Sequence, residues 1–105
     1  MSIIRLENIE TEKNKRGIKI KNIIKNDNVA VKNLILEQSD VIVAHQVSVD
    51  VLFHVIEGQG SIMIGEEVYG LKAKDFISCP PNTPMKVMAD KGVKFSVLNI
   101  KTPSL

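Results

Sequence analysis

Short apolar stretches alternate with polar residues along most of the chain from residue 18 onward. In one of them Val47, Val49 and Val51 are separated by single polar residues, which is the period of a half-buried strand. Other strands are expected within residues 18–24, 29–36, 41–43, 51–56, 61–64, 68–69, 76–77, 85–88 and 93–100. Because helix signals are weak and the strands are short and closely spaced, the pattern predicts an all-β sandwich or barrel.

Turn-forming residues separate these stretches. Residues 25–28 read Lys-Asn-Asp-Asn, and residues 57–60 read Glu-Gly-Gln-Gly, which we interpret as a glycine-rich turn. A turn at residues 65–67 predicts a hairpin between its two flanking strands. The segment 79–84 contains three prolines and is therefore expected to be a rigid loop at a sheet end.

The length of 105 residues corresponds to one domain. We divide it into an N-terminal extension, residues 1–16, and a single barrel domain, residues 17–105. No apolar run is long enough to span a bilayer, and the first residues lack a secretory pattern. A lone cysteine, Cys79, leaves no partner for an internal disulfide and suits a small buried apolar role. These features predict a cytoplasmic protein that does not act in a membrane.

The net charge is only +2, but residues 13–32 hold seven basic residues and one acidic residue. A basic segment of this kind can bind nucleic acid. No aromatic residue is interleaved with these bases, so a stacking platform for nucleotides is missing. We therefore interpret the segment as a solvated strand face with lysines on an exposed edge, and we expect no nucleic-acid partner.

At residues 39–89 the chain resembles the cupins, a superfamily of small double-stranded β-helix or jelly-roll barrels. Cupins carry two motifs whose spacing this chain reproduces. In the first motif Ser39 takes the opening glycine position and Gly58 the closing one, with His45, Val47 and Val51 at the first histidine, second histidine and glutamate positions. In the second, Lys74, Pro80, Asn82, Met85 and Ala89 take the glycine, proline, glycine, histidine and asparagine positions. The resemblance implies an RmlC-like cupin barrel.

The residues at the metal-ligand positions of this resemblance are mostly unsuited to a metal. Typical cupins hold Fe, Mn, Ni or Zn with three histidines and one glutamate. Of the four matching residues here only His45 is a credible donor, because valine cannot ligate and methionine is a soft ligand. We therefore predict no cofactor, while a divalent Zn, Ni, Fe or Mn ion held by His45, with His54 as a weaker second ligand, is the alternative.

Valine and methionine at inward positions would make the barrel interior apolar. Such an interior is either packed shut or open as a pocket for a small apolar or amphipathic molecule. The predicted pocket residues are His45, Val47, Val51, Phe53 and Met85. His54 lies nine residues after His45, so strand alternation places it on the other face unless a bulge intervenes.

The sequence thus favours a small cupin-domain protein that binds or senses a small molecule without a metal. The alternative is a metal-dependent cupin enzyme of the dioxygenase or isomerase type, with a reduced site that uses His45. Catalytic residues cannot be assigned, because no nucleophile elbow, P-loop or dinucleotide fingerprint is found. A third hypothesis is a structural or interaction role, in which the barrel dimerises and does no small-molecule chemistry. Outward apolar residues such as Leu52 and Ile56 suit a homodimer under all three hypotheses.

Overall fold

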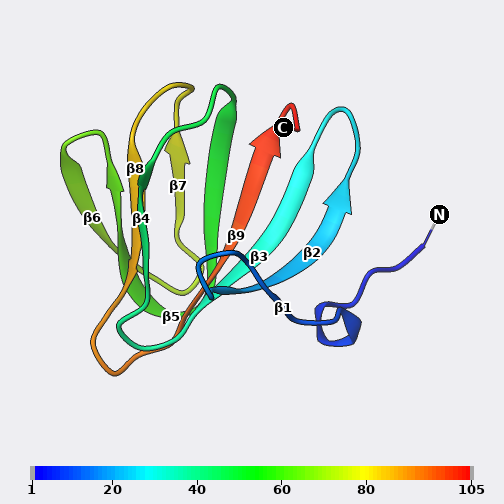
Figure 1. Cartoon of the computed structure of the whole chain (residues 1–105), viewed down its shortest axis with the longest axis horizontal. Helices are drawn as coiled ribbons and strands as arrows, with labels where there is room; N and C mark the ends of the chain where they lie inside the picture. Colours follow the sequence, from blue (N-terminus) through cyan, green and yellow to red (C-terminus); the bar gives the residue numbers. More distant parts are fainter. Residues whose placement is uncertain (1, 105) are drawn as a thin grey trace.

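The computed structural model describes residues 2–104 as nine strands in a strongly curled antiparallel arrangement (Figure 1). A short 3-10 turn, η1 (Leu6–Asn8), precedes them. The strands are β1 (Glu12–Lys13), β2 (Lys19–Lys25), β3 (Ala30–Leu36), β4 (Val41–His45), β5 (Asp50–Ile64), β6 (Glu67–Lys72), β7 (Phe76–Cys79), β8 (Met85–Ala89) and β9 (Phe95–Thr102). The predicted all-β jelly-roll barrel is confirmed. Within the described residues, no helix has the length and apolar character needed to cross a bilayer.

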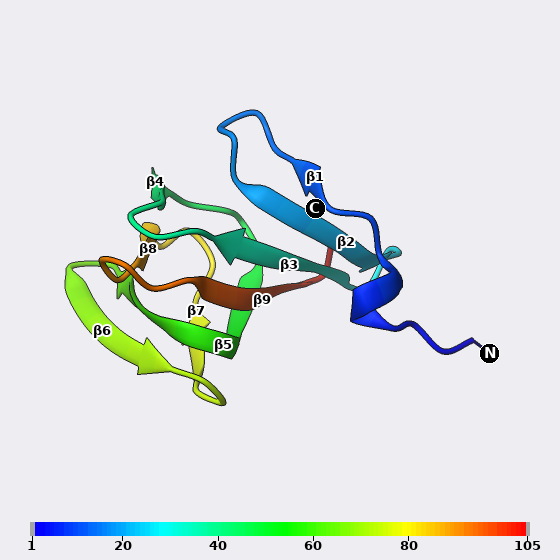
Figure 2. The same cartoon turned by 90° about the horizontal axis from the view of Figure 1, so that it is seen from below.

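The 15-residue strand β5 joins the two sheets of the barrel. Its first half lies between β9 and β7 in a sheet that continues through β3, β2 and β1. Its second half lies between β8 and β6, and β4 completes that sheet beside β8. Seen from below, the strands curl around a common interior (Figure 2).

The glycine-rich turn predicted at residues 57–60 is wrong, because β5 runs through it without turning back. The pairing of β5 with β9 shifts register between Val55 and Glu57, which marks a bulge. Gly58 follows with a φ of 82°, in the left-handed region that glycine favours. A bulge bends a strand and increases its twist, so this short segment redirects β5 from one sheet into the other.

The alternating strand predicted at residues 47–51 is also only partly present. β4 ends at His45 and β5 begins at Asp50, so residues 46–49 form the connection from one sheet to the other. The backbone oxygen of Val47 accepts a hydrogen bond of 2.7 Å from the backbone N–H of Asn82. This bond ties the connection to the proline-rich loop rather than to a neighbouring strand. Val49, in the same connection, is buried without belonging to a strand.

Inward-facing residues of both sheets form one hydrophobic core. β5 contributes Val51, Phe53 and Val55, all at most 1% exposed, and the residues between them face outward. The second half of β5 adds Ile62, and the rest of the core comes from the other strands and from Ile18: Leu34, Leu36, Ile42, Cys79, Met85, Val87, Phe95 and Val97. The period-two pattern of the sequence therefore translates directly into two faces of each sheet.

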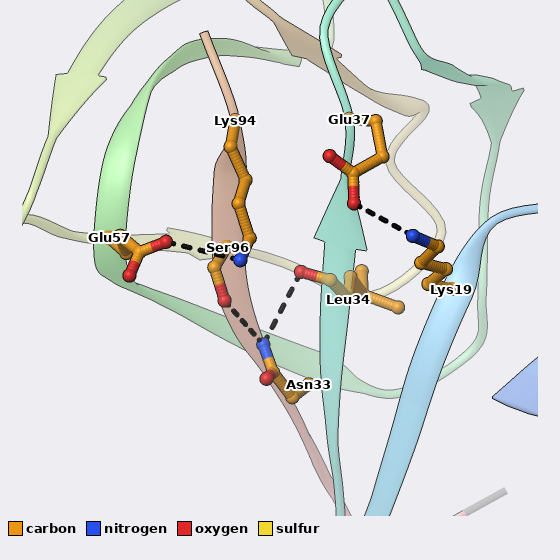
Figure 3. Close-up of polar contacts among 7 residues, drawn as sticks. All are labelled: Lys19, Asn33, Leu34, Glu37, Glu57, Lys94 and Ser96. Atoms are coloured by element: carbon orange, nitrogen blue, oxygen red, sulfur yellow. Dashed lines mark hydrogen bonds and ion pairs between the residues drawn. The ribbon is translucent and has the colours of Figure 1, made fainter. Parts of the chain in front are cut away.

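A polar cluster on the outer face joins β3 to β9. The side-chain amide of Asn33 donates a hydrogen bond to Ser96 Oγ at 2.9 Å (Figure 3). It also donates to the backbone oxygen of Val97 at 3.2 Å. Asn33 is only 2% exposed. Lys21 Nζ, on the neighbouring strand, donates to the backbone oxygen of Leu6. The N-terminal segment is thus attached to the outer face of the sheet, and β1 adds to its edge; the division at residue 17 stays a prediction.

Candidate functional site

A cavity of about 130 Å³ lies between the two sheets. Its lining draws on six strands and the N-terminal segment: Asn14, Ile20, Lys32, Leu34, Ile42, His45, Phe53, Val87, Asn99 and Lys101. Apolar side chains form one part of this wall, and the amide, imidazole and ammonium groups form the other. Ligand sites of proteins combine an apolar lining with a few polar groups in this way, and most are larger, at about 300–1,000 Å³.

His45 lines this cavity, and one of its ring nitrogens has a partner within its own strand. Its Nδ1 lies 3.0 Å from the backbone oxygen of Val43, which is a contact within the same strand. A carbonyl oxygen only accepts, so Nδ1 holds a proton and donates in this contact. In the neutral imidazole Nε2 is then the free acceptor, and the ring can receive a hydrogen bond from a ligand.

Asn99 supplies the most unusual polar group of the cavity. The residue is 6% exposed, and its Oδ1 has no hydrogen-bond partner among residues 2–104. Burial of an unpaired amide oxygen costs about 1–3 kcal/mol, so native proteins seldom leave one without a water or ligand partner. Asn99 lines the cavity, and rotation of its amide would bring this unsatisfied oxygen to a donor on a bound molecule.

The register of β3, β9 and β5 places these polar groups next to the apolar wall. Lys32 lies opposite Asn99, and Asn99 lies opposite Phe53, so the three residues form one row on the inward face. Phe53 itself is 1% exposed. This row therefore places a charged group, an amide and an aromatic ring side by side on three neighbouring strands.

The structure brings together two of the five predicted pocket residues, His45 and Phe53, in the lining of the cavity. Val51 and Met85 are buried in the core and are not part of this lining, although Met85 lies opposite His45 in register. Val47 is half-buried in the connection between β4 and β5 and packs against the core.

His54 lies away from the cavity, on the outward side of β5. Its ring stacks on Phe76 with ring centroids 4.0 Å apart and an angle of 21° between the planes. Its Nδ1 lies 3.3 Å from the backbone oxygen of Asp75. His45 and His54 therefore do not converge, and the proposed second metal ligand belongs to a surface contact.

The residues at the cupin ligand positions do not fit a metal held by three histidines and a glutamate. His45 is the one donor among the four, and the other three positions hold valine, valine and methionine. Among residues 2–104 no group of three or more His, Cys, Asp or Glu side chains is placed to hold a metal ion. Cys79 does not add a soft ligand here, because it is 1% exposed and burial raises the pKa of its thiol.

Sequence reasoning missed Asn99, Lys32 and Lys101. A signal for them was present in the alternation of β9, where Phe95 and Val97 face inward and Asn99 and Lys101 continue the same row. Two polar residues on the inward face of an otherwise apolar strand indicate a site rather than a core.

Lys101 is held in an unfavourable electrostatic position. Burial lowers the pKa of its ammonium below the ordinary value, and the nearby charges of Lys32 and Lys25 lower it further. The charged and titratable groups that surround it on this face are these two lysines and, across the cavity, His45. The folded protein without a ligand therefore disfavours the charged form of Lys101.

We expect Lys101→Met to raise the melting temperature at neutral pH by a few degrees. A depressed lysine pKa means that the unfolded state binds the proton more tightly, so the cost to stability is fully present below the folded-state pKa. The destabilisation by Lys101 disappears as the pH rises towards the ordinary lysine pKa. The increase in melting temperature of Lys101→Met should therefore become smaller at alkaline pH. Thermal melts at neutral and alkaline pH measure this, with Lys91→Met in the exposed turn before β9 as the control. An equal or lower melting temperature for Lys101→Met at neutral pH would contradict the prediction.

No protein-family model matches the chain, and no curated protein sequence matches it either. Several solved structures, however, match the chain over most of its length. KdgF from Halomonas sp. superimposes with a TM-score of 0.90 at 17% identity, over 100% of this chain and 96% of that one. An RmlC-like cupin from Shewanella frigidimarina gives a TM-score of 0.86 at 16% identity, over 95% and 88%. A predicted oxalate decarboxylase from Thermotoga maritima gives 0.85 at 13% identity, over 98% and 100%.

These similarities extend over nearly the whole chain, and they agree with the curled antiparallel sheets and with the motif spacing seen in the sequence. At such low identity they bear on the fold and not on the chemistry of the site. The protein has the cupin fold.

Proposed function

We propose that this protein binds a small organic molecule in the cavity between its sheets, without the metal site typical of cupins. The observation that carries the proposal is the buried, unpartnered Oδ1 of Asn99 in the wall of that cavity. Asn99 and His45 Nε2 offer acceptors to one ligand, and Phe53 with its aliphatic neighbours offers an apolar surface.

The size of the cavity limits the ligand. An apolar cavity of about 150 Å³ in another protein accommodates benzene. A cavity of about 130 Å³ therefore suits a body no larger than a single six-membered ring, unless the ligand also extends out of the mouth. A donor group such as a hydroxyl would satisfy Asn99, and binding would remove the cost of its unpaired oxygen.

Phenol is a suitable first probe, because it combines a ring with one hydroxyl donor and is neutral at pH 7. We expect saturable chemical-shift changes at Phe53, Val87 and Asn99 in a ¹H–¹⁵N NMR titration. Asn99→Leu keeps the side-chain volume but removes the acceptor, so it should weaken phenol binding about tenfold. The matched control is Gln38→Leu, an exposed residue in the turn after β3.

The absence of saturable shifts at the cavity residues would contradict the proposal. Metal analysis tests the alternative enzyme hypothesis on the same samples. Stoichiometric Zn, Ni, Fe or Mn in the wild-type protein that is lost in His45→Ala would favour a reduced metal site in place of simple ligand binding.

A further inference from the structure

Three lysines lie close together on the paired strands β2, β3 and β9, beside the cavity. Lys25 lies opposite Ala30, Ala30 lies opposite Lys101, and Lys32 is two residues further along β3. Side chains two residues apart on one strand share a face, so all three lysines lie on the inward side of the sheet. Diagonal neighbours such as Lys32 and Lys101 are about 7–8 Å apart at the backbone, within reach of one shared ligand.

Two hollows of this region share the lysines in their lining. Lys32 and Lys101 line the inner cavity of about 130 Å³ and also an outer groove of about 400 Å³ between β2, β3 and β9. Lys25 lines the outer groove. A molecule that occupied both hollows would contact Lys32 and Lys101.

No carboxylate offsets this charge within the part of the chain that the structure describes. The ion pairs of residues 2–104 join Lys19 to Glu37, Lys72 to Asp75 and Lys94 to Glu57. Neither hollow is lined by an aspartate or a glutamate. Figure 3 shows two of these pairs, and neither includes one of the three lysines.

This arrangement is costly without a ligand, because the three ammonium groups repel one another and Lys101 is half-buried. Most lysines can avoid such a cost by extending into water. Here the inward position on β3 and β9 keeps two of them beside the cavity. An anion placed between them would turn the repulsion into attraction.

We propose that the ligand is a small organic carboxylate, with its anionic group between Lys32 and Lys101 and its apolar body against Phe53. The inference rests on the proposed function and adds the charge and orientation of the ligand. A carboxylate at the mouth and a hydrogen-bond donor near Asn99 would together satisfy every polar group named in the lining on the β3 and β9 side. Inorganic phosphate would satisfy the lysines alone and leave the apolar wall bare.

The test compares benzoate with its neutral analogue benzamide, with phenol and with inorganic phosphate, by NMR titration of the full chain at pH 7. Benzoate should bind about tenfold more tightly than benzamide, because hydrogen bonds to charged groups contribute more than neutral ones. Lys101→Met and Lys32→Met should each weaken benzoate about tenfold and leave benzamide and phenol within about twofold. Lys91→Met should leave all four probes unchanged.

Several outcomes would overturn the inference and are distinguishable from failure of the proposed function. Equal affinity for benzoate and benzamide would show that charge is not recognised, while the cavity still binds small molecules. Phosphate binding as tight as that of benzoate would show that no apolar body is required. An equal loss of benzoate binding in Lys91→Met would indicate nonspecific charge attraction. Failure of all probes, phenol included, would remove the proposed function as well. Thermal melts confirm that each variant is folded.

Discussion

We expect Gly58→Ala to prevent stable folding or to lower the free energy of unfolding by about 3 kcal/mol or more. A Cβ on Gly58 would lie 1.7 Å from the backbone oxygen of Lys94 and 2.8 Å from its carbonyl carbon. Both are main-chain atoms of the segment that leads into β9, so no side-chain rotation relieves the clash. The φ of 82° adds conformational strain for any residue with a Cβ.

Gly70→Ala is the matched control for this experiment. Gly70 lies in the interior of β6, and a Cβ built there meets no atom within 4 Å. Its substitution should change stability by no more than about 0.5 kcal/mol. Urea unfolding of the two variants gives the comparison. Similar midpoints for Gly58→Ala and Gly70→Ala would mean that β9 can move away from β5 without cost, and that the bulge does not fix the junction of the two sheets.

The error at residues 57–60 shows where local sequence reasoning stops. A Glu-Gly-Gln-Gly segment between two apolar runs has the composition of a turn. Its actual role depends on Lys94, 36 positions further along the chain, whose main chain comes too close for any side chain at Gly58. That approach is a tertiary contact, and no local pattern encodes it.

The cupin motif spacing located the left-handed turns of the backbone correctly, even where the residue at the position is not glycine. The positions matched to cupin glycines hold Ser39, Lys74 and Asn82, and these are the non-glycine residues with positive φ among residues 2–104, at 69°, 80° and 57°. Gly58, the one matched glycine that is retained, has positive φ as well. The geometry of the barrel therefore requires these left-handed turns even where the chain has lost the glycine, and asparagine tolerates that conformation best of the three.

The strand pattern itself was largely predictable, because the strands that build the core have an inward apolar face whose alternation is visible in the sequence. β2, β3, β4, β7 and β8 lie where apolar alternation or short apolar runs placed them. The connection at residues 46–49 was not predictable in the same way. Its alternating valines imitate a strand, and the hydrogen bond from Asn82 to Val47 that holds it comes from a distant loop.

The candidate site was less predictable than the fold, for a physical reason. The motif spacing pointed to His45, but Lys32, Asn99 and Lys101 come from β3 and β9, outside both motifs. Lys25 and Lys32 belong to the basic segment that we interpreted as a solvated edge. Only the pairing of β3 with β9 shows that they gather beside Lys101 at the mouth of the cavity.

Phe53→Ala should cost about 3–5 kcal/mol of stability, a large part of the roughly 5–15 kcal/mol that a domain of this size possesses. Phe53 is among the largest fully buried side chains, and it packs between Asn99 and Ile77 on the neighbouring strands. Removal of the ring would enlarge the cavity and leave core atoms without contacts. The melting temperature should fall by about 15 °C or more.

Phe76→Ala makes the same change of side chain at a site 62% exposed, where the lost contact is the stack on His54. It should cost less than about 1 kcal/mol, since exposed aromatic contacts are weak. Benzene added to Phe53→Ala should restore part of the lost stability, because binding to the folded state alone raises the free energy of unfolding with ligand concentration. It should have no such effect on Phe76→Ala. If benzene did not stabilise Phe53→Ala, the enlarged space would have collapsed, and Phe53 would be a core residue rather than a wall that shapes a binding cavity.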